Sequence, residues 1–233
     1  MSREQSGTRD QNQFSIRPYN PQFKERIRAL CCDTGYFGCP VERVFQDRAW
    51  FADFNTHYYL EYEPDVCFVA EADNRVIGYI LGCRRPKKFS FIFYPFIAVP
   101  LMLKAAWKSF AGIYDRKSRQ YIKNLVFKGS RDRAKRPEGA AHFHFNVRQG
   151  YRNQGVGRAL VVALMRRFME NGVKRVYGEL LHLEKLRDEN FYTAHGFEIY
   201  DKKRTTLLGE EFGPVYMMTV VADMRRLKEV FGL

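Results

Sequence analysis

The segment at residues 140–170 constrains the fold of this chain more than any other part of the sequence. Residues 140–147 alternate between apolar and polar side chains, which predicts a β-strand. Residues 156–170 repeat an apolar side chain every fourth position and end at Asn171 and Gly172, which predicts a helix with a glycine C-cap. A strand, a glycine-containing turn and a helix in this order indicate an α/β fold.

The turn between that strand and that helix is suited to hold an anion. Its sequence runs Arg152, Asn153, Gln154, Gly155, Val156 and Gly157. Backbone amides that open a helix point at an anion, and glycines let a phosphate approach the backbone. The same pattern also occurs as an ordinary turn, so taken alone it leaves both interpretations open.

The rest of the chain predicts more strands and helices around this unit. Alternating or β-branched runs predict strands at residues 14–20, 66–72, 75–83, 175–181, 197–207 and 215–223. Apolar spacing predicts helices at residues 22–31, 41–59 and 186–195. We find no repeat and no linker. We therefore expect a single domain over residues 1–233, with residues 1–13 as a disordered lead-in.

Composition narrows the choice of partners. A formal charge of +13 and a pI near 9.6 attract anions, whether a polyphosphate cofactor, nucleic acid or an anionic membrane. We do not favour nucleic acid. The five cysteines lack the paired spacing of a zinc site, so no metal is expected. The polar N-terminus lacks the apolar core of a secretory signal, and a cytoplasmic location is expected.

Residues 84–138 are predicted to be an insertion between the third and fourth strands. Their apolar stretch, residues 89–103, is shorter than the roughly 20 residues needed to cross a bilayer. Pro95 and Pro100 are also expected to interrupt it. We expect a buried or pocket-lining segment. Peripheral membrane contact through residues 89–103, flanked by lysines, is the alternative that we do not favour.

Two sequence motifs resemble those of the GNAT superfamily of acyltransferases. RNQGVG, at residues 152–157, resembles its (Gln/Arg)-x-x-Gly-x-(Gly/Ala) acetyl-CoA signature, and NFYTAHGF, at residues 190–197, resembles its FY-x-x-x-GF segment. The resemblance implies a three-layer α/β/α fold with a central mixed, mostly antiparallel sheet. It also implies acetyl-CoA as cosubstrate, no metal, and transfer of the acetyl group to an amine by direct attack in a ternary complex. CDTGYFG and HFHFNV are similar to the acetyltransferase-like domains related to those of O-GlcNAc hydrolases.

The resemblance also implies the roles of individual residues. Tyr192 is the expected proton donor to the CoA thiolate, and Glu179 is the first candidate for the base, with Asp33, Glu71, His142 and His144 as rivals. Asp33 and Tyr36 are expected to border the acceptor amine. The expected contacts of acetyl-CoA are Phe145, Asn146, Val147, Arg152, Asn153, Gln154, Gly155, Val156, Gly157 and Arg158, with Arg148 as a further helper for the phosphate charge.

Two departures from the family pattern keep a second interpretation open. Lys185 stands where an asparagine often precedes the Phe-Tyr pair, and Asn146 stands where the narrower group tends to have an aspartate. An amide cannot act as a base. The alternative is therefore a catalytically inactive module that binds acyl-CoA or a protein partner. The sequence leaves the acceptor, the base and the oligomeric state, including a homodimer, undetermined.

Overall fold

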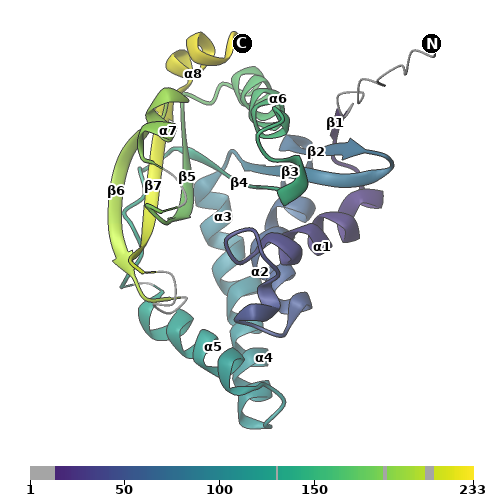
Figure 1. Cartoon of the computed structure of the whole chain (residues 1–233), viewed down its shortest axis with the longest axis vertical. Helices are drawn as coiled ribbons and strands as arrows, with labels where there is room; N and C mark the ends of the chain where they lie inside the picture. Colours follow the sequence, from purple (N-terminus) through teal and green to yellow (C-terminus); the bar gives the residue numbers. More distant parts are fainter. Residues whose placement is uncertain (1–13, 130, 186–187, 208–212) are drawn as a thin grey trace, which may run out of the picture.

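A seven-stranded sheet runs through the molecule in the order β1-β2-β3-β4-β5-β7-β6 (Figure 1). This computed structural model describes residues 14–129, 131–185, 188–207 and 213–233, so the predicted lead-in lies outside the described part. All neighbouring strands are antiparallel except β4 and β5, which confirms the predicted mixed, mostly antiparallel sheet. The strands are β1 (Ser15–Pro18), β2 (Cys67–Ala72), β3 (Arg75–Cys83), β4 (Ala141–Val147), β5 (Arg175–His182), β6 (Glu198–Thr205) and β7 (Val215–Asp223).

Helices cover both faces of this sheet. On one face lie α1 (Lys24–Thr34) and α2 (Arg48–Tyr62), and on the other lies α6 (Val156–Glu170), which also contacts α8 (Met224–Phe231). The short helix α7 (Asn190–Ala194) stands between β5 and β6 in the chain (Figure 1). The three-layer α/β/α arrangement expected from the sequence is thereby confirmed.

Strand β3 separates the two hydrophobic cores. Tyr79 belongs to the core under α1 and α2, whereas Ile80 belongs to the core under α6, because successive side chains of a strand point to opposite faces. Gly82 allows α6 to pack closely, since a Cβ atom there would lie 2.7 Å from Leu164 Cδ1. The sheet and α6 are therefore in direct contact behind the turn at residues 152–157.

The insertion between β3 and β4 is helical. Helix α3 (Pro86–Ile92), a π-helical turn (Phe93–Ala98) and α4 (Val99–Phe110) form one continuous helix of 25 residues. Helix α5 (Arg116–Lys128) follows, and α4 and α5 together extend beyond the sheet at the bottom of the view (Figure 1).

The expectation that prolines interrupt this segment is wrong. Pro95 lies within the π-helical turn, a form of helix that absorbs local breaks in the regular hydrogen-bond ladder. Pro100 is the second residue of α4, directly after the π-helical turn, and the helix continues through it. The expectation of a buried segment at residues 89–103 is also wrong for one face of the helix: Phe93 is 8% exposed, but Phe96 is 66% exposed.

Candidate active site

The sheet opens between β4 and β5. Their parallel pairing covers only residues 141–143 of β4 and 176–178 of β5. Beyond that point β4 stays paired with β3, and β5 stays paired with β7. Among the described residues, the β5-facing edge of residues 144–147 thus has no strand partner. Its backbone N–H and C=O groups can pair with the amides of an extended ligand.

The turn that follows β4 exposes the start of α6. Asn153 and Gly155 adopt left-handed backbone conformations, with φ of 62° and 81°. Gly155 is the N-cap of α6, and no described side chain caps the helix there. A Cβ atom at Gly157 would be 3.9 Å from Phe145 at its nearest contact, so this side of the turn is uncrowded. The first amides of α6 are therefore placed to bind an anion beside the free edge of β4.

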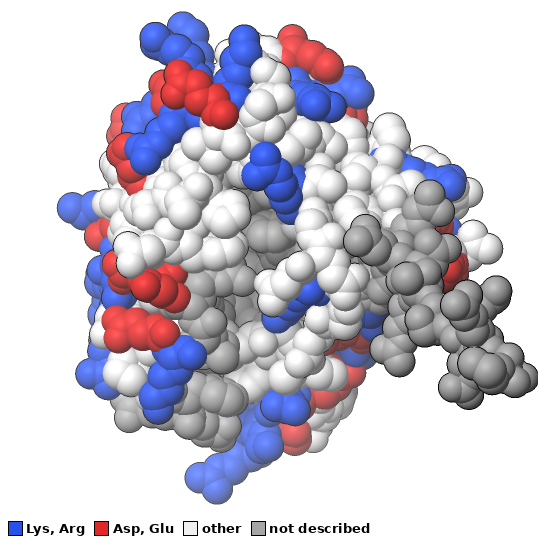
Figure 2. Space-filling view, turned by 45° about the horizontal axis from the view of Figure 1, so that its top comes forward, with Lys and Arg blue, Asp and Glu red and all other residues white. Residues whose placement is uncertain are grey.

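The end of the molecule that carries α6 and α8 is hollowed near its middle. Figure 2 looks toward this end and shows an uncharged depression with Lys or Arg side chains at its rim. A polyanionic ligand with an apolar arm matches such a surface, since the charged groups remain at the rim.

The arginines near the turn are held by neighbouring groups. Arg152 donates from Nε to the Val147 carbonyl oxygen at 3.1 Å. Its guanidinium also lies against Gly38, where a Cβ atom would approach within 2.6 Å of it. The guanidinium of Arg158 lies over the ring of Phe231 in α8, 5.1 Å from the ring centroid. Arg152 therefore fastens the turn to β4 and to the loop after α1.

Two residues expected at the acceptor side lie at the end of α1 and in the following loop. Asp33 accepts hydrogen bonds from Arg48 at 2.7 Å and from Arg148 at 3.3 Å. Tyr36 is only 2% exposed, and its backbone forms a bridge with Cys39. The Asp33 carboxylate is thus already neutralised by two guanidinium groups.

The two residues expected to carry the chemistry lie on β5 and α7. Glu179 forms an ion pair with Arg136, which comes from the end of the insertion. Burial lowers the pKa of Arg136, but the hydrogen bond with Glu179 outweighs burial and raises it. Tyr192 is half-buried in α7, with its ring 5.9 Å from that of His182 on β5. Both residues thus lie on or beside β5, but Tyr192 packs against the core under α6, whereas Glu179 pairs with the insertion.

A partly buried polar network lies on β3 and β4. Asn146 donates from Nδ2 to the Tyr79 hydroxyl at 2.8 Å, and that hydroxyl lies 3.0 Å from His144 Nε2. Since the hydroxyl accepts from Asn146, we assign its own proton to the bond with His144. Burial lowers the pKa of His144 to about 4, so its imidazole is neutral at pH 7. His144 Nε2 thus accepts the hydrogen bond from Tyr79, and the lowered pKa disfavours a further proton on the imidazole.

Sequence reasoning named His144 and Asn146 but missed Tyr79. The signal that unites them is the register of β3 and β4, which pairs Tyr79 with Asn146 and Leu81 with His144. The other candidate histidine, His142, is packed among the rings of Tyr59, Phe89 and Tyr177. Burial, followed by the charge of Arg136, lowers the pKa of His142 to about 3. The remaining rival for the base, Glu71, is engaged at the other end of the sheet by Arg17 and Arg26.

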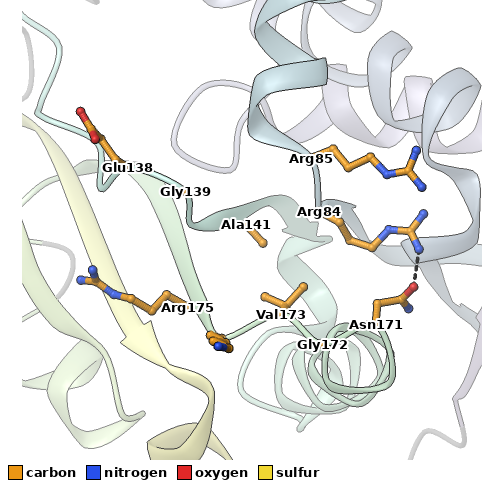
Figure 3. A pocket seen from close by; sticks show the side chains of 10 residues that line it. Arg84, Arg85, Glu138, Gly139, Ala141, Asn171, Gly172, Val173 and Arg175 are labelled. Carbon is orange, nitrogen blue, oxygen red and sulfur yellow. Dashed lines mark hydrogen bonds between the residues drawn. The ribbon is translucent and has the colours of Figure 1, made fainter.

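A cavity of about 470 Å³ lies away from the turn. It stands at the C-terminal end of α6, where Arg84 points toward Asn171 and donates to it at 2.5 Å, near Ala141 at the start of β4 (Figure 3). Since the first turn of α6 is at the opposite end of that helix, this cavity is separate from the candidate active site. In the described part of the chain, no three His, Cys, Asp or Glu side chains gather as metal ligands.

Comparison with known proteins identifies the family. The model of the acetyltransferase (GNAT) family matches residues 32–197, which is more than half of the chain. The chain therefore belongs to the GNAT acetyltransferase family. Enzymes of this family use acetyl-CoA and an acceptor substrate. A comparison with curated proteins finds no match.

Solved structures show the same fold. The crystal structure of SsHAT is 24% identical, with a TM-score of 0.65, and the match covers 91% of this chain and 98% of that one. The polyamine N-acetyltransferase of Drosophila melanogaster, which forms N-acetylagmatine, is 14% identical with a TM-score of 0.53; the match covers 91% of this chain and 100% of that one. The protein smu.2055 of Streptococcus mutans UA159 is 15% identical, with a TM-score of 0.52. The match covers 90% of this chain and 99% of that one. The narrower resemblance to the domains of O-GlcNAc hydrolases stays a prediction.

Proposed function

We propose that this protein is an N-acetyltransferase that transfers the acetyl group of acetyl-CoA to an amine by direct attack in a ternary complex. One observation carries the proposal: the free edge of β4 leads directly to the uncapped, glycine-bearing start of α6. The first feature suits the amides of pantetheine, and the second suits a diphosphate. The thioester supplies the reactivity when acetyl-CoA is bound, and the protein binds, orients and moves protons.

The cofactor would be held mainly by backbone groups. The amides of residues 154–157 would bind the diphosphate, and Asn153 would shape the turn through its left-handed conformation. Residues 145–147 would pair with pantetheine through their main chain, since the Asn146 amide is already bonded to Tyr79. Arg158, on the first turn of α6, would add positive charge.

Proton transfer would involve both sides of the opening. Tyr192 would donate a proton to the departing thiolate, since a phenol carries an O–H donor. Glu179 remains the first candidate for the base. Its carboxylate is already paired with Arg136, so an attacking amine would have to compete with that guanidinium for it. The neutral imidazole of His144 is the rival on the β4 side.

A second candidate function is a module that binds acyl-CoA without turnover. The observation that favours it is the pairing of the candidate carboxylates with arginines: Asp33 with Arg48 and Arg148, and Glu179 with Arg136. In such pairs a guanidinium group already neutralises each carboxylate, so a cationic amine gains less from it.

The deciding experiment is calorimetric titration with acetyl-CoA, followed by a free-thiol release assay over a panel of amines. Binding with thiol release for at least one amine supports the acetyltransferase, and replacing Tyr192→Phe should then lower kcat more than it raises the Kd for acetyl-CoA. Binding without release for any amine favours the second candidate. Absence of binding at millimolar acetyl-CoA would overturn both.

A further inference from the structure

The insertion at residues 84–138 carries almost the whole net charge of the protein. It contains fifteen Lys and Arg but only three Asp and Glu, giving +12 of the total +13. The rest of the chain, which includes the candidate active site, is nearly neutral. The basic character is therefore a property of one structural unit, and that unit lies outside the sheet.

The same insertion also carries most of the exposed apolar surface. Of the fifteen large hydrophobic side chains exposed in the described part, ten lie within it. They are Phe91, Tyr94, Phe96, Val99, Leu103, Trp107, Phe110, Ile113, Val126 and Phe127. Clustered exposed apolar side chains of this size mark a surface that binds a partner or a membrane.

The opposite face of the helix Pro86–Phe110 is part of the protein core. Phe93 packs edge-on against Phe54 of α2, with 5.3 Å between ring centroids. Trp50, also on α2, donates from Nε1 to the Leu101 carbonyl oxygen at 2.7 Å. The end of the helix is fastened as well, because Lys108 donates to Asp47 at 2.5 Å.

These contacts decide between crossing a membrane and lying on one. By length and composition the helix is apolar enough to span a bilayer, and it is the one such helix in the described part of the chain. Entering the bilayer would uncover the aromatic face of α2 and break the bond to Leu101. A helix with one face held by a domain, and the other face apolar and flanked by lysines, suits the plane of the membrane surface.

We propose that the exposed face of Pro86–Phe110, together with α5, docks this protein on an anionic phospholipid bilayer. The aromatic side chains, Trp107 and Phe110 among them, would enter the headgroup region, where amphipathic rings are favoured. Lysines such as Lys104 and Lys123, both exposed, would lie against lipid phosphates.

The charge argues against the other occupants of this surface. A second copy of the chain would bring +12 against +12, and like charges across an interface oppose association. Nucleic acid would neutralise the basic side chains but would leave aliphatic residues such as Val99 and Leu103 in water. An anionic bilayer satisfies both features, because it offers phosphate and hydrocarbon at adjacent depths.

The chain provides its own spectroscopic reporter. It has two tryptophans: Trp50 is 1% exposed in the core, and Trp107 is 61% exposed on the proposed docking face. Mixing the full chain with vesicles of phosphatidylcholine and phosphatidylserine at a ratio of about 7:3 should shift the emission to shorter wavelength and carry the protein upward in flotation. Vesicles of phosphatidylcholine alone should do neither. In Trp107→Phe the spectral shift should disappear while flotation persists.

Variants separate the apolar contribution from the charge. The triple change Phe96→Ser, Leu103→Ser and Phe110→Ser should lower the vesicle partition coefficient by at least about tenfold, whereas Tyr200→Ser, an exposed aromatic on β6, should not change it. The double change Lys104→Glu and Lys123→Glu should also lower the vesicle partition coefficient by at least about tenfold. Its control is Arg166→Glu with Lys228→Glu, which makes an equal change of charge on α6 and α8 and should lower the coefficient much less. Circular dichroism and thermal melts check that each variant is folded.

Three results would overturn the proposal. One is no flotation with either vesicle. Another is flotation of the folded triple variant equal to that of the parent chain. The last is a parent chain that binds no vesicles but forms dimers or binds oligonucleotides, if the triple serine variant loses that activity. None of these readouts depends on acetyl-CoA, so the membrane proposal and the proposed function fail independently.

Discussion

The turn at residues 152–157 and the helix Pro86–Phe110 both contain residues that disrupt regular backbone, and they use them in opposite ways. In the turn, Gly155 takes a left-handed conformation at the N-cap of α6, so the chain leaves the turn after β4 and begins the helix there. In the helix, Pro95 and Pro100 are absorbed without ending it. The turn is determined by local chemistry, whereas the continuity of the helix comes with its packing against α2.

The two regions also differ in what they present to solvent. The opening at β4 and α6 presents backbone amides in a nearly neutral part of the chain. The insertion presents aromatic rings and lysines and holds nearly all of the net charge. The proposed chemistry and the proposed membrane docking thus fall on different units, which meet at the ion pair of Arg136 with Glu179.

The largest effect is expected from the inward face of the insertion. Phe93 and Phe96 lie in the same π-helical turn, but Phe93 is 8% exposed and Phe96 is 66% exposed. Replacing Phe93→Ala should lower the free energy of unfolding by about 3–5 kcal/mol, because it leaves a cavity against Phe54. Phe96→Ala should change it by less than about 0.5 kcal/mol. Urea denaturation measures both, and equal losses would show that the insertion is not held as described.

The boundaries predicted from the sequence were best where the signal is local. The sequence predicts a helix at residues 156–170 and a strand at residues 215–223, and the structure has α6 and β7 with the same bounds. Helix α8 was not predicted, although Asp223 caps it and its apolar residues Met224, Leu227 and Phe231 follow helical spacing. The preceding strand residues run into it without a glycine or proline to mark the boundary.

The candidate site was predictable only in part, for a physical reason. The glycine turn depends on backbone conformations that Gly155 itself specifies. The ion pair of Arg136 with Glu179 and the bond of Tyr79 to His144 join residues 43 and 65 positions apart. Such pairings follow from strand register and from the path of the insertion, neither of which periodicity encodes.

The next largest effect is expected on acetyl-CoA binding, and it compares the glycine before α6 with the glycine after it. Gly155 and Gly172 flank α6, have φ of 81° and 70°, and would each place a Cβ atom in open space. Replacing either by alanine should cost a similar backbone strain of about 1–2 kcal/mol. Only Gly155→Ala should weaken acetyl-CoA binding, by about tenfold or more, since its Cβ atom would stand where the diphosphate approaches. Calorimetric titration measures the affinity of both variants for acetyl-CoA. Equal affinities would mean that the diphosphate binds elsewhere.

The smallest effect concerns Asp47, which joins the insertion to α2. Its carboxylate caps α2 through the Trp50 amide and accepts from Lys108 and from the Tyr114 hydroxyl. Burial by itself would raise the pKa of Asp47, but the bonds from Lys108, Tyr114 and the Trp50 amide outweigh it and lower the pKa. A lowered pKa means that the carboxylate stabilises the folded state above its unfolded pKa of about 4, and that this stabilisation disappears as the pH falls through the lower, folded value.

Asp47→Asn should therefore lower the free energy of unfolding by about 1.5 kcal/mol at pH 7, and this deficit should shrink toward zero as the pH drops below about 4. Asp115→Asn is the matched control, because Asp115 caps α5 through the Ser118 amide and asparagine caps a helix about as well as aspartate. Its effect should stay under about 0.5 kcal/mol across the same pH range. A deficit for Asp47→Asn that is constant from pH 7 to pH 3 would mean that shape, and not the ion pair with Lys108, joins the insertion to α2.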